Sequence, residues 1–210
     1  MKHIWAFVLL GGIVFSLLAG GATAQMFSGR PDTLSTNVTF SSHDPVSFQI
    51  IINDKQIATR RSSRVGDTGA TPYTGYFDKT LNVDLRWIEV FSETAFQTSF
   101  KVPTKSLSRL DAKGEHASLT IRIGANGAVD IMTPHPELNK HLREGTEDKI
   151  TPEMDVPVIL KTSCASQLEA ADPKTVEMKV WLNAQTLKRA KRYKADAQQT
   201  GAAIATRDRC

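Results

Sequence analysis

One short segment, residues 134–141, has the residue types for metal binding or acid–base chemistry. It contains His135, Glu137 and His141. The two histidines are six residues apart, so one face of a helix would not present them together as it presents an i, i+4 pair. Glu137 and His141 do have the i, i+4 spacing, but a single pair falls short of the three or four ligands that a zinc site uses. We therefore expect structural or solvated side chains here and no metal site.

Catalytic and cofactor-binding motifs are absent from the sequence. It has no G-x-S-x-G nucleophile elbow, no S-x-x-K set, no H-E-x-x-H, no P-loop and no dinucleotide fingerprint. An active site can also be assembled from dispersed residues, so an enzyme remains a minor alternative. We expect a protein that is not an enzyme and that needs no cofactor.

The first 24 residues are typical of a signal peptide. Lys2 and His3 precede an uncharged apolar stretch, residues 4–18, and an Ala-x-Ala cleavage site ends at Ala24. The apolar stretch is shorter than the roughly 20 residues of a membrane span, although an uncleaved anchor is an alternative. We expect cleavage after Ala24 and a mature protein in the periplasm or secreted.

The only two cysteines are Cys164 and Cys210, the last residue of the chain. Two thiols cannot build a disulfide-rich scaffold or a four-thiolate zinc site. An exported protein with an even number of cysteines favours pairing, although two free thiols are the alternative. We expect a Cys164–Cys210 disulfide that ties the C-terminal tail to the body of the protein.

Positive charge is concentrated at the C-terminus. The formal net charge of the whole chain is +4, but residues 173–210 alone carry nine basic and three acidic residues, a net +6. Residues 25–172 carry 16 basic and 19 acidic residues, a net −3, so the mature protein has a net charge of +3. The basic side chains of the densest run are Lys188, Arg189, Lys191, Arg192 and Lys194.

This basic run has more than one interpretation. Cations stabilise the C-terminal end of a helix, and a charged run is commonly a solvated helix face. The alternative is a docking surface for an acidic protein partner. An anionic membrane surface is possible in physical terms but is not favoured. Nucleic acid is not expected, because no aromatic platforms lie beside the cations.

A second candidate contact surface is formed by Arg60, Arg61 and Arg64. These residues open a segment, residues 60–76, that is rich in Arg, Ser, Gly and Thr, and we expect it to be a long loop. A flexible, solvated loop competes with a role in partner binding.

The middle of the chain has the alternating pattern of antiparallel β-strands. Apolar residues alternate on either side of Asn53–Asp54, around residues 92–94, and on either side of Asn126–Gly127. Asn-Gly between alternating apolar residues is the strongest local signal for a hairpin. We expect three hairpins, with a first strand near Val38 and Phe40 leading into the first of them. Strand 83–91 carries apolar residues on both faces, so both faces are expected to be covered.

The remaining elements complete an α+β fold. Residues 136–142 predict a short helix that ends at Gly145, residues 156–160 another strand, and residues 175–199 one long helix whose apolar stripe includes Val180. We predict a mainly β fold, an antiparallel β-sandwich or curled sheet built from hairpins, with a C-terminal α-helix. The expected division is 1–24 signal peptide, 25–172 β-rich domain, and 173–210 basic helix and tail.

The length and composition agree with this organisation. The chain has 210 residues, of which 40% are hydrophobic and 23% charged. These values are those of an ordinary globular protein and exclude a disordered chain or a coiled coil. After cleavage the chain suits one main domain.

Three strand motifs carry a resemblance to a known group. They are Val-Asp-Leu-Arg-Trp at residues 83–87, Phe-x-Val-Pro at 100–103, and Leu-Thr-Ile-Arg-Ile-Gly-Ala-Asn-Gly-Ala-Val at 119–129. With the exported leader, this order resembles small periplasmic β-rich proteins of Gram-negative bacteria. Some of these are immunity partners of type VI secretion phospholipase effectors. The resemblance covers about residues 38–133 and implies no individual site residue.

Two functions from different classes follow. The first is a non-catalytic periplasmic binding protein that neutralises or docks onto a protein partner, such as an immunity protein against a secreted effector. The second is a structural component of an envelope-spanning secretion, conjugation or pilus assembly. Both need a rigid β-domain with an exposed contact surface, and neither needs catalytic residues.

Overall fold

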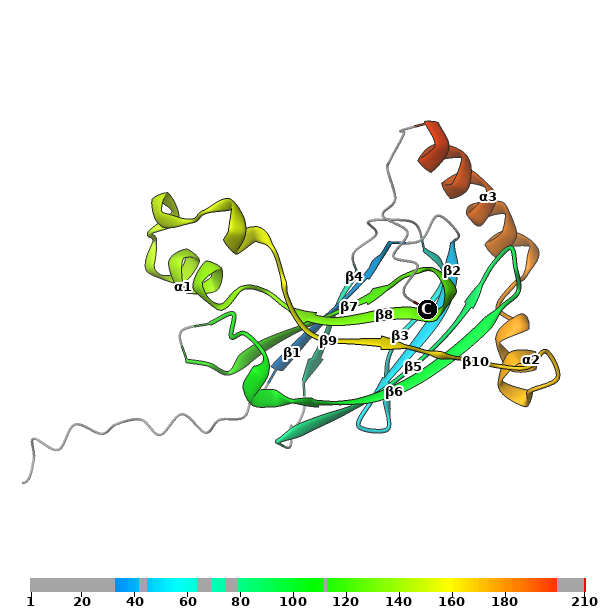
Figure 1. The fold of residues 1–210 in the computed structure, drawn as a ribbon, viewed down its shortest axis with the longest axis horizontal. Coiled ribbons are helices and arrows are strands. Elements are labelled where there is room, and N and C mark those ends of the chain that lie inside the picture. Colours follow the sequence, from blue (N-terminus) through cyan, green and yellow to red (C-terminus); the bar gives the residue numbers. More distant parts are fainter. Residues whose placement is uncertain (1–32, 42–44, 64–68, 75–78, 112, 200–209) are drawn as a thin grey trace, which may run out of the picture.

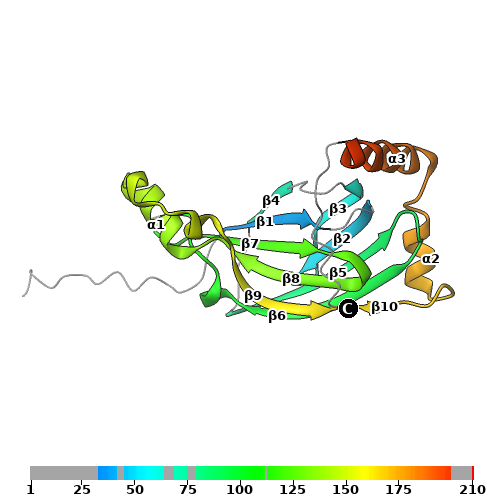
Figure 2. The ribbon, with the colours of Figure 1, turned by 45° about the horizontal axis from the view of Figure 1, so that its top comes forward.

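The fold consists of two five-stranded β-sheets that pack face to face, with helices at opposite ends (Figures 1 and 2). The predicted mainly β, α+β class is confirmed. The expected signal peptide, residues 1–24, lies outside the residues described. The computed structural model describes residues 33–41, 45–63, 69–74, 79–111, 113–199 and 210.

The two sheets are linked where the chain passes from one edge strand to the other. The first sheet has the strand order β4-β1-β7-β8-β9 and the second β10-β6-β5-β2-β3, so β9 and β10 are consecutive edge strands joined by Ala165. The strands of the first sheet are β1 (Thr33–Phe40), β4 (Gly69–Thr74), β7 (His116–Ile123), β8 (Ala128–Thr133) and β9 (Val158–Cys164). Those of the second are β2 (Val46–Ile52), β3 (Lys55–Ser63), β5 (Thr80–Glu89), β6 (Ala95–Pro103) and β10 (Ser166–Gln167).

The three predicted hairpins are present as β2–β3, β5–β6 and β7–β8. Asn53 and Asp54 have φ values of 48° and 63°, and Asn126 and Gly127 have values of 54° and 86°. Such positive φ values suit the tight turns of hairpins and are tolerated by Asn, Asp and Gly. The turn residues therefore define where each of these two hairpins reverses.

The first strand does not pair with its neighbour in sequence. β1 runs parallel to β7 and antiparallel to β4, whereas β2 belongs to the other sheet. The alternating pattern of β1 is nevertheless as predicted, since Leu34, Val38 and Phe40 are buried in the core between the sheets. The strand is therefore held by residues far along the chain and not by a hairpin.

The expectation of a long loop over residues 60–76 is wrong. β3 continues through Ser63, and Gly69–Thr74 forms β4. β4 pairs with β1 over six residues of each strand. This pairing between distant segments supplies the backbone hydrogen bonds that the turn-rich local sequence does not predict.

The main core lies between the sheets and is centred on β5. The Trp87 side chain is fully buried and stacks on the Phe96 ring at a centroid distance of 5.2 Å. Burial of a large apolar side chain stabilises the fold by about 1.5–3 kcal/mol. On the outer face of the same hairpin, Ile88 and Ala95 form a second buried cluster with Met178 and Trp181 of the C-terminal segment. The prediction that both faces of this strand are covered is confirmed.

The short helix predicted after the third hairpin is confirmed as α1 (Pro136–Glu144). It ends at Gly145, whose φ of 63° gives the left-handed helix cap. Short 3-10 segments complete the connections: η1 (Thr104–Ser106), η2 (Ala125–Gly127), η3 (Glu147–Lys149) and η4 (Pro152–Asp155).

The predicted single C-terminal helix is two helices. α2 (Pro173–Lys179) and α3 (Ala184–Gln199) are separated by residues 180–183. Asn183 starts α3 because its Oδ1 accepts a hydrogen bond from the Thr186 N–H at 3.0 Å. Val180, which was expected in the apolar stripe, is 72% exposed, because α2 packs against the body through Thr175 and Met178 on the opposite side.

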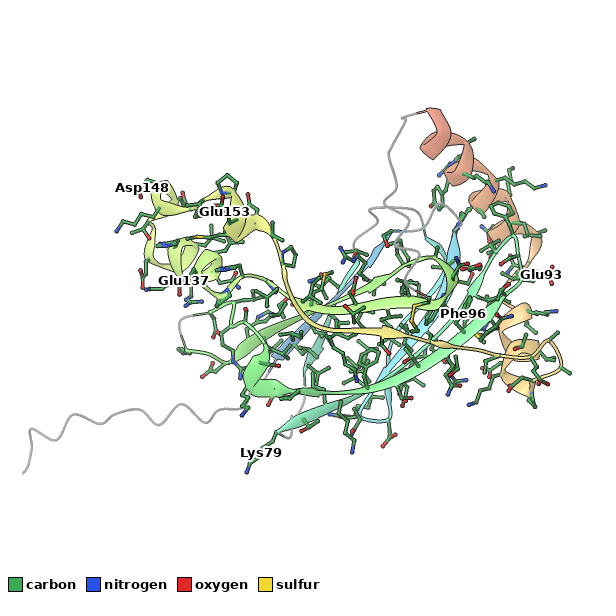
Figure 3. All side chains as sticks on the ribbon, in the orientation of Figure 1. Lys79, Glu93, Phe96, Glu137, Asp148 and Glu153 are labelled. Atoms are coloured by element: carbon green, nitrogen blue, oxygen red, sulfur yellow. A yellow bond between two sulfur atoms is a disulfide. The ribbon has the colours of Figure 1, made fainter. Side chains whose placement is uncertain are left out.

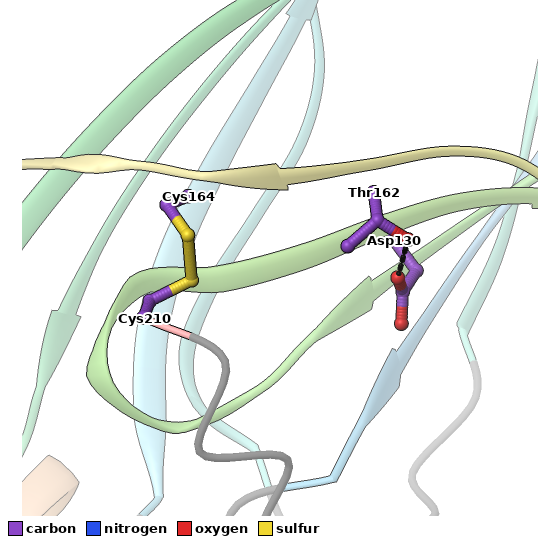
Figure 4. The surroundings of a disulfide bond; sticks show 4 residues. All are labelled: Asp130, Thr162, Cys164 and Cys210. Carbon is purple, nitrogen blue, oxygen red and sulfur yellow. Dashed lines mark hydrogen bonds between the residues drawn. A yellow bond between two sulfur atoms is a disulfide. The ribbon is translucent and has the colours of Figure 1, made fainter.

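The disulfide between Cys164 and Cys210 is confirmed, with Cα atoms 5.6 Å apart (Figure 4). It joins the end of β9 to the last residue of the chain and closes a loop with a sequence separation of 46. On the same face of the first sheet, the Asp130 carboxylate accepts hydrogen bonds from the Thr162 hydroxyl at 2.6 Å and from Arg122. The disulfide therefore closes the segment that carries both C-terminal helices, α2 and α3.

A polar turn leads into β7. The Asp111 carboxylate accepts the backbone N–H groups of His116 at 2.9 Å and Glu115 at 3.2 Å. Burial favours a higher pKa for this carboxyl, but the hydrogen bonds to His116, Glu115 and its own N–H outweigh burial and lower the pKa. The ionised form is therefore the one that the folded turn stabilises.

Removal of the disulfide is expected to destabilise the protein without changing the sheets. In the Cys164→Ser/Cys210→Ser variant the unfolded chain regains the entropy of the open loop, a loss of up to about 4 kcal/mol of stability. Urea unfolding of the oxidised wild type and the variant measures the difference. A loss below about 1 kcal/mol would show that the tail is held without the covalent bond.

Asp111→Asn is expected to lower stability by about 1 kcal/mol at pH 7, because the amide has one acceptor oxygen and no charge. The carboxyl has a lower pKa in the folded state than in the unfolded state. Its contribution to folding stability is therefore fully present when the pH is above the unfolded-state pKa of about 4, and it is lost as the pH falls through the folded-state pKa. Urea unfolding at pH 7 and near pH 3 should therefore show a difference that shrinks in acid. The exposed Asp155→Asn is the control. A difference that does not depend on pH would contradict this role of the charge.

Candidate functional site

A dense run of exposed positive charge lies on α3. Thr186 and Ala190 are buried one helical turn apart, and they fix this side of the helix against the body next to β3. The exposed surface of the helix carries four cations, which we call the basic face: Lys188, Arg189, Lys191 and Arg192.

The position of these cations along the helix tests whether they stabilise its C-terminal end. α3 extends to Gln199, and its last turn contains no basic residue. A favourable interaction with the helix dipole acts only within the last turn, so it does not account for the basic face. The predicted stabilisation of the helix C-terminus therefore has no geometric support.

The basic face also repels itself. Lys188 is three residues from Lys191 and four from Arg192, and like charges at these spacings destabilise a helix by about 0.2–0.5 kcal/mol per pair. Among the residues that the structure describes, none forms an ion pair with the four cations. The face therefore costs the isolated protein stability.

Lys194 differs from the other four predicted docking residues. It is half-buried, and its Nζ lies 4.7 Å from the centroid of the Phe91 ring. Such a cation–π contact attaches the second half of α3 to the turn between β5 and β6. Lys194 therefore helps to hold the helix in place.

The second predicted surface is only partly described. Arg60 and Arg61 lie within β3 and not in a loop, and Arg64 lies outside the described residues. β3 is the strand that α3 contacts. The structure thus brings the strand that contains Arg60 and Arg61 next to the helix that carries the basic face.

Apolar residues beside this helix were missed by the sequence reasoning. Val176 of α2 is 54% exposed, Val180 directly after α2 is 72% exposed, and Phe91 is 36% exposed. The i, i+4 spacing of the two valines is present in the sequence, but the predicted apolar stripe placed Val180 on the buried side of the helix. We call these three side chains the apolar corner.

Among the described residues, one serine lies within hydrogen-bond distance of a histidine on the outer face of the first sheet. Ser35 Oγ and His116 Nε2 are 2.8 Å apart, a contact between residues 81 positions apart that the sequence could not predict. Ser35 lies in the middle of β1, between β4 and β7, where backbone N–H groups serve sheet pairing and not an oxyanion. The Asp111 oxygens are occupied by backbone N–H groups. The arrangement is that of a cross-strand contact.

The histidines of the 134–141 segment have structural contacts. His135 caps α1, since its Nδ1 accepts the Glu137 N–H at 3.2 Å. His141 Nδ1 lies 2.8 Å from the Thr146 hydroxyl oxygen. Within the described ranges, no three His, Cys, Asp or Glu side chains come together as metal ligands would.

Comparison with known proteins gives no relative from which a role for this surface could be taken. No family model matches the chain, and no curated protein shows significant similarity to it. Among the described residues, no helix is both long and apolar enough to cross a membrane.

Proposed function

We propose that the protein is a non-catalytic binding protein that docks onto an acidic surface of a protein partner through the basic face of α3. The observation that carries the proposal is the position of Lys188, Arg189, Lys191 and Arg192. They are exposed in the middle turns of an anchored helix, outside its last turn, and no described residue forms an ion pair with them.

The energetics of the basic face favour a functional origin. Like charges on one helix reduce stability, and a protein keeps such a cost most readily where function requires it. Charge complementarity raises association rates and excludes wrong partners more than it raises affinity. A cationic helix fixed on a rigid sheet also loses little conformational freedom on binding.

The expected compartment agrees with this role. The Cys164–Cys210 disulfide is typical of an oxidising environment. Together with the leader expected over residues 1–24, it supports a protein that acts in the periplasm or outside the cell. The partner would therefore be an exported or imported protein.

Charge reversal on the basic face is expected to weaken partner binding. The Lys188→Glu/Arg192→Glu variant changes the net charge by −4 at two exposed positions, and its affinity should fall at least tenfold with a weaker dependence on salt. Affinity purification of the tagged full-length protein from envelope extracts at low salt compares the variant with wild type. The matched control is Lys101→Glu/Lys105→Glu, which makes the same charge change at exposed positions on β6 and η1.

The partner is the protein that wild type and control retain and the α3 variant loses. Folding of the α3 variant is checked by urea unfolding, and its stability should stay close to that of wild type. The changes make the 188/191 and 189/192 pairs attractive, while positions 188 and 192 still carry like charges. If every co-purifying protein stays bound to the folded α3 variant, the proposed docking face is wrong.

Neutralisation of a toxic effector is the specific form of binding that we propose. An inhibitor can act by covering its target, and this requires only a complementary surface. Loss of the gene should then be toxic only when a neighbouring effector gene is intact, and the wild-type protein but not Lys188→Glu/Arg192→Glu should restore growth. Harmless deletion beside an active neighbour would contradict immunity but leave docking itself to be judged by the binding assay.

A further inference from the structure

Exposed large apolar side chains gather beside the basic face. Six such side chains occur among the described residues, and half of them are Phe91, Val176 and Val180 of the apolar corner. Single apolar residues on a surface are normal, but a group next to a charged face is typical of an interaction site. Packing of the fold does not explain why these three apolar side chains are exposed together.

Two contacts attach α2 and α3 to the same turn, which places the apolar corner and the basic face at one end of the molecule. Lys179 Nζ of α2 lies 3.5 Å from the Glu93 carboxylate, and Lys194 Nζ of α3 lies 4.7 Å from the Phe91 ring centroid. Phe91 and Glu93 belong to the same turn between β5 and β6. Figures 1 and 3 show α2, α3 and Glu93 at one end of the molecule, with Glu137, Asp148 and Glu153 at the other.

The two valines are not needed to attach α2. Thr175 and Met178 are the buried residues of this helix, and Met178 packs with Trp181 against Ile88 and Ala95. Val176 and Val180 lie one helical turn apart on the outward side. The helix is thus anchored by one face and presents an apolar pair on the other.

We infer that the apolar corner and the basic face together bind one segment of the protein partner in which apolar side chains lie beside carboxylates. This inference rests on the proposed function and adds the chemistry of the partner. The carboxylates would face Lys188 and Arg192, and the apolar side chains would cover Val176 and Val180. Apolar burial supplies affinity that salt does not screen, and the cations supply steering and register.

A protein segment fits this surface better than a membrane. Membrane-surface binding depends on a long apolar face inserted among the acyl chains and is marginal for small apolar groups. The corner offers two valines and a ring that already contacts Lys194. An apolar core with a charged rim is the normal composition of a protein–protein interface.

Two synthetic peptides test the inference with the full-length, disulfide-bonded protein. The first is a 16-residue helical peptide with leucine on one face and glutamate on the other, and the second has serine in place of every leucine. Fluorescence anisotropy at two salt concentrations measures both affinities for wild type, Val176→Ser/Val180→Ser and Lys188→Glu/Arg192→Glu. The control is Leu142→Ser/Val156→Ser, which removes two exposed apolar side chains at the other end of the molecule.

We expect the leucine peptide to bind wild type and control about tenfold more tightly than the serine peptide. The valine variant should lose this preference and keep the salt dependence. Equal binding of the two peptides by wild type, or an unchanged preference in the valine variant, overturns the inference and leaves the docking face intact. If Lys188→Glu/Arg192→Glu binds both peptides as tightly as wild type does, the proposed function is overturned instead. Wild-type binding to phosphatidylglycerol vesicles that the valine variant loses would assign the corner to a membrane and overturn the inference.

Discussion

The backbone contact between Gly127 and Ala165 holds the place where the chain crosses directly from the edge of the first sheet to the edge of the second. The Ala165 N–H donates to the Gly127 carbonyl at 2.8 Å where the chain leaves β9 for β10. A Cβ on Gly127 would lie 3.1 Å from the Ala165 carbonyl oxygen and from the Phe96 ring, and its φ of 86° is strained for any larger residue. Phe96 in turn stacks on Trp87. Glycine is needed here because the crossing strand and the aromatic core both close on its backbone.

In the sequence, all residues of the proposed docking surface follow the crossing at Ala165, except Phe91 in the turn between β5 and β6. The segment begins at Cys164, passes through α2 and α3, and returns to Cys164 through the disulfide with Cys210. Met178 and Trp181 attach its middle to the outer face of the second sheet. A covalent closure and an apolar anchor therefore act on one loop, and the surface that it carries is held in place before a partner arrives.

The elements that could be predicted from the sequence are those encoded by neighbouring residues. The β2–β3 and β7–β8 turns depend on Asn53–Asp54 and Asn126–Gly127, whose positive φ values reverse the chain locally. The parallel pairing of β1 with β7 joins Thr33 to His116, and no local pattern encodes a contact over that distance. For the same reason β4 was expected to be a loop, since only its pairing with β1 makes it a strand.

In the candidate site, the residue types could be predicted from the sequence, but the direction in which each side chain of the helices faces could not. The cations of α3 could be identified from composition alone, but their role depends on where the helix begins and ends. The stripe predicted for one continuous helix included Val180, which would have left an exposed face of charge only. In the structure α2 docks through Met178, Trp181 packs on the same side, and Val180 lies exposed next to Lys179. A purely charged face would lose most of its attraction in salt, whereas a face that also offers apolar surface can retain a partner after charge has steered it into contact.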